Sequence, residues 1–157
     1  MKDFRGSKCY VGVDLSSGGD LTSIAIVIPY IVDGVKKYFV HTHSFIPKSR
    51  VDEHIKTDKI PYDLWIEKGL VTVTETLGGI KTDYKYIIKY LEDLIKEYGL
   101  KPQLICYDPH NASAFLSDLE ALPAHVTGGM CYRNQILKSI RIKLKNRIRF
   151  QPVLRRV

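Results

Sequence analysis

The chain has 157 residues, which is the length of one ordinary domain and enough to bury a hydrophobic core. Hydrophobic residues make up 45% of it and charged residues 26%, as in a typical folded protein. No apolar run approaches the roughly 20 residues that a membrane-spanning helix needs, so we expect a cytoplasmic protein with no membrane partner.

The net charge of +7 is unevenly distributed along the chain. Residues 1–122 contain 15 Lys/Arg and 17 Asp/Glu, whereas residues 123–157 contain nine Lys/Arg and neither Asp nor Glu. A local basic block is typical of a polyanion-binding segment or of a solvated arm. We therefore predict a folded core over residues 1–122 and a basic tail over residues 123–157, whose pattern fits a strand and a helix equally well.

Three strand-like segments come first. Residues 8–14, 21–29 and 37–46 are short, apolar and separated by glycine-containing turns. Such closely spaced strands predict an antiparallel three-strand meander.

Helical patterns follow the meander. Short helical pieces are expected over residues 48–68, with apolar side chains that include Leu64 used for packing, and a fourth short strand over 70–76. Residues 82–98 place seven apolar side chains on one helical face. Residues 103–108 form an apolar strand ending in an acid, and a helix should begin at Pro109. This order predicts an α/β fold: a mixed sheet, the meander plus a strand parallel to residues 8–14, flanked by helices.

The three cysteines show no metal-binding spacing. Cys9, Cys106 and Cys131 form no CxxC pair and have no histidine at zinc-ligand spacing. Cys9 and Cys106 lie within apolar strands, so we expect them to be small buried hydrophobic residues.

Two acids end predicted strands. Asp14 and Asp108 each follow an apolar run and precede turn-forming residues. If their strands are parallel neighbours, both carboxylates emerge at one edge of the sheet, where ligands bind in open α/β sheets. Oxygen ligands favour Mg²⁺ or Mn²⁺. A strand-end Asp is also a common turn or helix N-cap residue, so the residues alone leave both roles open.

A pair of carboxylates at one edge suits phosphodiester hydrolysis by two metal ions. One ion activates a water and the other stabilises the leaving oxygen, about 3.5–4 Å away. Asp14, on the strand expected to be central, would bridge the ions, and Asp108 would hold one flank.

Two motifs resemble the nuclease domain of the phage terminase large subunit. VGVDLSS at 11–17 followed by DLT at 20–22 is similar to the family's first acidic strand, and YDPHNA at 107–112 is similar to its second acidic segment. The resemblance covers about residues 8–122. It implies a ribonuclease-H-like fold and metal-dependent cutting of double-stranded DNA during genome packaging, with Asp14 and Asp108 as catalytic metal ligands. Asp20 matches a recurring acid that fixes the turn or contributes to the metal site, and His110 stands where the family often has an aromatic residue.

The chain departs from that family in two ways. It has no phosphate-cradling GxxxxGK[ST] loop, so the resemblance implies a separate terminase ATPase portion or other packaging subunits as partners. The family's third catalytic Asp comes late in the domain, but here no Asp or Glu follows Glu120. We therefore expect a truncated or frameshifted prophage gene in a bacterial host, and little or no nuclease activity from this chain alone.

Other interpretations stay open at this point. The +9 tail suits a non-catalytic nucleic-acid-binding remnant. An actin-like ATP-binding lobe also begins with a strand, a turn and an acid, although this chain is too short for the two lobes of such a kinase. A resolvase or transposase of the same fold would use similar acids.

Overall fold

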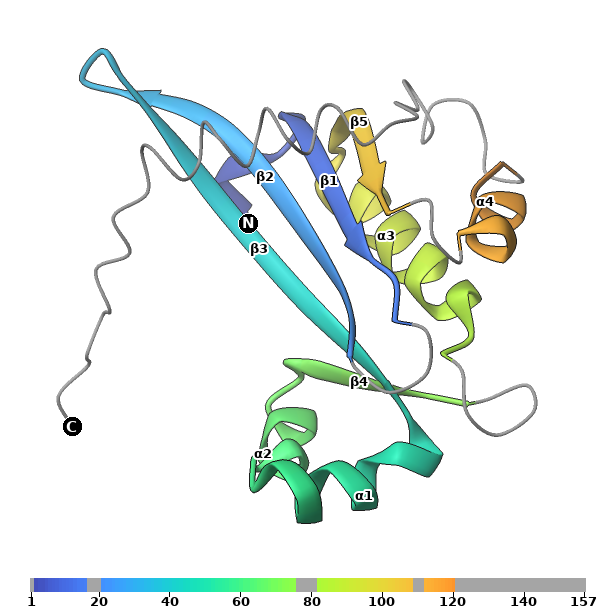
Figure 1. Ribbon diagram of the computed structural model, residues 1–157. Helices are drawn as coiled ribbons and strands as arrows, with labels where there is room; N and C mark the ends of the chain where they lie inside the picture. Colours follow the sequence, from blue (N-terminus) through green and yellow to red (C-terminus); the bar gives the residue numbers. More distant parts are fainter. Residues whose placement is uncertain (1, 17–20, 76–81, 109–111, 121–157) are drawn as a thin grey trace, which may run out of the picture.

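The computed structural model describes residues 2–16, 21–75, 82–108 and 112–120 (Figure 1). A short 3-10 helix covers Lys2–Phe4. The five strands are β1 (Lys8–Asp14), β2 (Thr22–Val32), β3 (Val35–Pro47), β4 (Val71–Thr74) and β5 (Lys101–Tyr107). The four α-helices of the described part are α1 (Lys48–Asp58), α2 (Tyr62–Glu67), α3 (Tyr84–Tyr98) and α4 (Ser113–Glu120).

The strands form one mixed sheet in the order β4-β3-β2-β1-β5. β1, β2 and β3 pair antiparallel, which confirms the predicted meander, and β5 pairs parallel with β1 as expected. β4 adds a second parallel pair at the β3 edge. The β2–β3 turn uses Asp33 and Gly34, both with positive φ (52° and 73°), as a two-residue hairpin turn requires.

Helix α3 covers one face of the sheet, and α4 lies beside it (Figure 1). Alternate residues of β1 and β2 point toward these helices, because side chains alternate between the two faces of a strand. The core is formed by fully or nearly fully buried side chains from all these elements, including Cys9, Val11, Ile24, Ile26, Ile87, Leu91, Ile105, Phe115 and Leu119.

The clearest predicted helix has the predicted ends. Asp83 caps α3 by accepting a hydrogen bond from the backbone N–H of Lys85 (3.0 Å). Gly99 ends the helix in the left-handed region, at φ 58°, where a residue without Cβ is favoured. Glu92 and Lys96, one turn apart on α3, form an ion pair at 2.8 Å.

Two packing predictions were wrong in part. Leu64 on α2 is 39% exposed, although the neighbouring Trp65 packs against a second small core around Ile46, Tyr62 and Val71. Cys106 is only half-buried, because it lies on the face of β5 that points away from α3.

Several predictions concern residues outside the described ranges. Asp20, His110, Cys131 and the tail 123–157 belong to this group, as does the start of the helix predicted at Pro109. Within the described part, α4 begins at Ser113. No helix in these ranges is both long and apolar enough to cross a lipid bilayer.

Candidate metal centre

The two predicted acids stand at the same edge of the sheet. Val13 of β1 and Tyr107 of β5 are direct partners in the parallel ladder, and Asp14 and Asp108 are the next residues of their chains. Neighbouring strands lie about 4.8 Å apart. Both acids are exposed, so their carboxylates are accessible to a ligand from solvent.

Asp14 faces the side of the sheet opposite α3. Its neighbour Val13 is 6% exposed and packs into the core under the helices, so strand alternation directs Asp14 to the other face. There Asp14 borders a shallow hollow of about 400 Å³. Gly12 and Ala25 also line this hollow, and their small side chains leave the space beside the carboxylate open.

Two serine hydroxyls lie in the same hollow. Ser23 of β2 is the direct antiparallel partner of Asp14. Its Oγ hydrogen-bonds to the Oγ of Ser44 on β3, at 2.8 Å. These hydroxyls can donate to or accept from a water, or donate to a phosphate, beside the acid. Sequence reasoning missed them, because their position depends on the strand register.

The chain leaving Asp14 is held by contacts from two other elements. The backbone N–H of Ser16 donates to Oγ1 of Thr22 (3.2 Å), and the hydroxyl of Tyr84 donates to the carbonyl oxygen of Ser16 (3.4 Å). Leu15 between them is 8% exposed. Since Tyr84 is the first residue of α3, the N-terminal end of this helix lies at the edge with the acids.

The chain entering Asp108 is held by an aromatic cluster. The ring of Tyr107 packs edge-on against Phe115 of α4, with centroids 5.9 Å apart. Phe115 is fully buried and also packs against Tyr84, at 6.1 Å. Helices α3 and α4 therefore both support the strand end that positions Asp108.

The donors at this edge fit a hard divalent cation. Carboxylate and hydroxyl oxygens are the ligands that Mg²⁺ and Mn²⁺ prefer. The described ranges contain no group of three or more His, Cys, Asp or Glu side chains that could enclose a metal ion. Asp14 and Asp108 are therefore two carboxylates that could contribute ligands at this edge, and Asp20, the third predicted contributor, falls outside those ranges.

Two histidines form a separate polar pair on the α3 side of β3. His41 and His43 are two residues apart and therefore face the same side of the strand. Nε2 of His41 shares a hydrogen bond with the hydroxyl of Tyr90 (2.9 Å), and Nε2 of His43 with Oγ1 of Thr72 (2.7 Å). Burial lowers the pKa of both imidazoles, and the proximity of His41 lowers that of His43 further.

The histidine pair was not recognised in the sequence as a functional or structural unit. Its available signal was the alternation His-Thr-His inside a predicted strand. That signal gives the shared face, but not the partners Tyr90 and Thr72, which come from α3 and β4. The pair is hydrogen-bonded within the fold and is no part of the acidic edge.

Comparisons with known proteins give one family and one structural relative. The family model for the terminase large subunit, endonuclease domain, matches residues 1–154. The terminase large subunit of Enterobacteria phage HK97 is 30% identical over 115 residues, which cover 73% of this chain and 21% of that protein. The crystal structure of the HK97 bacteriophage large terminase matches with a TM-score of 0.69 and 26% identity, covering 93% of this chain and 28% of that one.

The matched relatives are much longer than this chain, which spans about a quarter of their length. The structural match supports the predicted ribonuclease-H-like arrangement of a mixed sheet flanked by helices. The family match also extends 32 residues beyond the boundary predicted at residue 122. The division of the chain into core and tail stays a prediction.

Proposed function

Because the chain belongs to the terminase large-subunit endonuclease family, we propose that it binds DNA and hydrolyses phosphodiester bonds with divalent metal ions held by Asp14 and Asp108. The observation that supports this proposal most directly is the parallel pairing of β1 and β5, which puts the two acids on neighbouring strand ends. The family match favours this function over the actin-like lobe and the resolvase.

Each acid has a distinct role in the proposed site. Asp14 lies on β1, which has a partner strand on each side, so its carboxylate stands between Asp108 on β5 and the serine hydroxyls on β2 and β3. From this central position Asp14 would hold both ions, and Asp108 would hold one flank. When bound, Mg²⁺ or Mn²⁺ supplies an activated water nucleophile and neutralises charge on the leaving oxygen. Ser23 and Ser44 orient water or phosphate within the hollow.

Activity of the isolated chain should be weak. Asp14 and Asp108 alone supply few ligands for two cations, so binding of the second cation should be weak. No acidic residue follows Glu120 in the sequence to supply a third carboxylate. The natural partners in this proposal are double-stranded DNA and the terminase ATPase portion or other packaging subunits, in the cytoplasm of a bacterium that carries a prophage.

Plasmid nicking tests the assignment of the acids. We expect slow Mn²⁺-dependent conversion of supercoiled DNA to the nicked form, abolished by EDTA and by Asp14→Asn or Asp108→Asn. Asp52→Asn, an exposed acid on α1, is the matched control and should leave the rate unchanged. Robust cutting that survives Asp14→Asn would show that the nuclease site lies elsewhere.

Metal binding gives a second readout that needs no turnover. A ligand that binds only the folded state raises stability by RT ln(1 + [L]/Kd), which is about 2.7 kcal/mol at 100 times Kd. Titration with Mn²⁺ should therefore raise the melting temperature of the wild-type protein and of Asp52→Asn. Asp14→Asn and Asp108→Asn should lose this increase.

The basic tail supports a second, non-catalytic role in DNA binding. Nine Lys/Arg and no acid in residues 123–157 suit sequence-independent phosphate contacts, each of which steepens the salt dependence of binding by about 0.9 in log–log slope. Replacing Lys143 and Lys145 with Gln should reduce that slope without changing Mn²⁺ binding. An unchanged slope would show that these two lysines of the tail do not contact DNA.

A further inference from the structure

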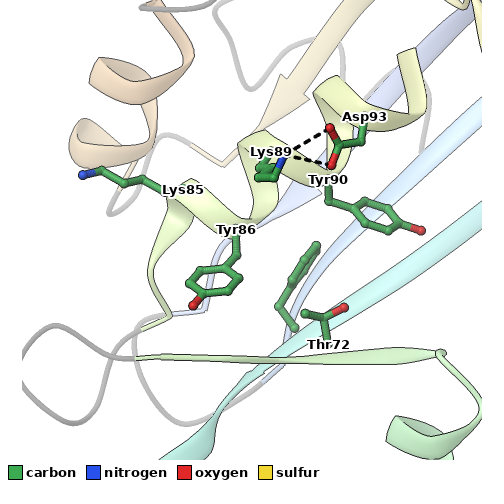
Figure 2. A pocket seen from close by; sticks show the side chains of 7 residues that line it. Thr72, Lys85, Tyr86, Lys89, Tyr90 and Asp93 are labelled. Carbon is green, nitrogen blue, oxygen red and sulfur yellow. Dashed lines mark hydrogen bonds and ion pairs between the residues drawn. The ribbon is translucent and has the colours of Figure 1, made fainter. Parts of the chain in front are cut away.

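A second cavity lies on the opposite side of the sheet, between α3 and the edge formed by β3 and β4 (Figure 2). Its volume is about 290 Å³, near the lower end for a small-molecule site. Phe45, Thr72, Tyr86 and Tyr90 form its walls. Three aromatic rings therefore line this cleft, together with the side chains of Thr72, Lys85, Lys89 and Asp93.

The inner wall of the cleft is rigidly held. Phe45 is fully buried, and the ring of Tyr90 stands at 84° to it with centroids 5.6 Å apart. Tyr90 is also hydrogen-bonded to His41 and stacked on His43, with ring centroids 4.2 Å apart and planes at 15°. Its orientation is fixed from two sides by the histidine pair.

The same histidine pair holds the opposite wall. His43 shares a 2.7 Å hydrogen bond with Thr72 of β4, so one imidazole links both sides of the cleft. A site whose walls are already ordered loses little entropy when a ligand enters. Tyr86 supplies the accessible ring: it is 37% exposed and extends from α3 toward β4 (Figure 2).

The outer rim of the cleft carries two lysines and one aspartate, Asp93. Lys85 and Lys89 lie at its edge on successive turns of α3, and Lys85 has no ion-pair partner among the described residues. Lys89 pairs with Asp93 at 3.2 Å, but the two side chains are 74% and 57% exposed. Such an exposed pair contributes little, so Lys89 can exchange the carboxylate for another anion.

The cleft begins close to the acidic edge. Tyr86 is two residues from Tyr84, whose hydroxyl contacts the chain just after Asp14. On the other side, Phe45 is the direct strand partner of Thr22, whose hydroxyl binds the backbone of Ser16. The cleft and the chain that follows Asp14 therefore both contact the first turn of α3 and the β2–β3 pair.

We propose that this cleft receives one unpaired nucleobase of the DNA strand that flanks the cut, with the base stacked on Tyr86 and the adjoining phosphates near Lys85 and Lys89. This inference rests on the proposed function, since it takes DNA as the substrate. An aromatic surface next to cations is the combination with which proteins bind single-stranded nucleic acid without sequence readout. An apolar peptide side chain would fit the rings but gains nothing from the two lysines.

Oligonucleotide binding tests the inference. Fluorescence anisotropy is measured in EDTA at fixed ionic strength with a dT oligonucleotide and with an abasic oligonucleotide of equal length. Contacts to phosphate, including those of the basic tail, are the same for both probes, so their ratio isolates base recognition. We expect the wild-type protein to bind the dT probe about five-fold or more tightly than the abasic probe.

Substitutions then assign that preference to the cleft. Tyr86→Ala should abolish it, whereas Tyr86→Phe, which keeps the ring, should retain it. Tyr38→Ala is the matched control, because Tyr38 is also an exposed tyrosine (56%) beside a lysine, Lys36. Lys89→Gln should weaken binding of both probes equally.

Three results would overturn the inference: equal binding of both probes by the wild-type protein, a preference that survives Tyr86→Ala, or an equal loss in Tyr38→Ala. The first two would favour an apolar peptide as the occupant of the cleft. Because EDTA removes metal from the assay, these outcomes are independent of plasmid nicking. If the wild-type protein showed no base preference but retained Asp14-dependent nicking, this inference would be refuted and the proposed function would stand.

Discussion

Truncating Phe115 to alanine should destabilise the protein and loosen the acidic edge at the same time. Phe115 is fully buried where α4, α3 and β5 meet, with the rings of Tyr84 and Tyr107 packed against it. A buried Phe→Ala change costs about 3–5 kcal/mol, with the higher values where the cavity cannot collapse. Rings supported from two other elements limit collapse, so we expect the upper half of that range.

Urea denaturation followed by circular dichroism measures this loss. In a domain of this size, it corresponds to a decrease of about 8–20 °C in melting temperature. Leu116→Ala is the control, because Leu116 is the next residue of α4 and is only half-buried; its cost should be about half as large. If Phe115→Ala lost no more than Leu116→Ala, the packing of α4 against Tyr107 would be refuted, and with it this helix's support of Asp108.

Two further predictions concern α3 and the histidine pair. Asp83→Ala removes the cap on the backbone N–H of Lys85 and should cost about 1 kcal/mol of unfolding free energy. Asp83→Ser keeps a capping hydroxyl and should retain most of that stability. Equal stability of the two variants would contradict the cap. The pKa values of His41 and His43 are lowered in the folded protein, so near neutral pH the unfolded chain binds more protons than the folded one. Stability is therefore full above the histidine pKa of the unfolded chain, near 6.5, and decreases as the pH falls through that pKa. Urea midpoints measured between about pH 7.5 and 5.5 should decrease with pH in the wild type, and the slope should flatten in the double variant His41→Gln/His43→Gln; an unchanged slope would assign it to other groups.

The sequence predicted correctly those features of the fold that one local pattern determines. The apolar face of α3 was predicted because its apolar residues recur at helical spacing, and five of them are buried in the structure. The shared edge of Asp14 and Asp108 needed one assumption, the parallel pairing of their strands. That assumption follows from the intervening helix α3, since parallel strands require a crossover connection.

Features that depend on how distant segments pack or pair were not predicted from the sequence. Leu64 is as apolar as its neighbours on α2, yet nothing in its local pattern indicates that the small core around Ile46 and Tyr62 excludes it. Ser23 stands beside Asp14 only because β1 and β2 pair with that register. The cleft beside α3 depends on the pairing of β4 with β3 as well as on the rotation of the helix, and neither is encoded in a short motif.

Helix α3 connects the two proposed sites through its geometry. Residues two apart on an α-helix are rotated by about 200° around its axis, so Tyr84 and Tyr86 emerge on different sides of α3. Tyr84 contacts the chain after Asp14, and Tyr86 lines the cleft with Phe45 and Thr72. A substitution that rotates or frays the first turn of α3 therefore disturbs both the acids and the cleft. Tyr86→Ala, whose ring is partly exposed, leaves the Tyr84 contact in place and separates the two effects.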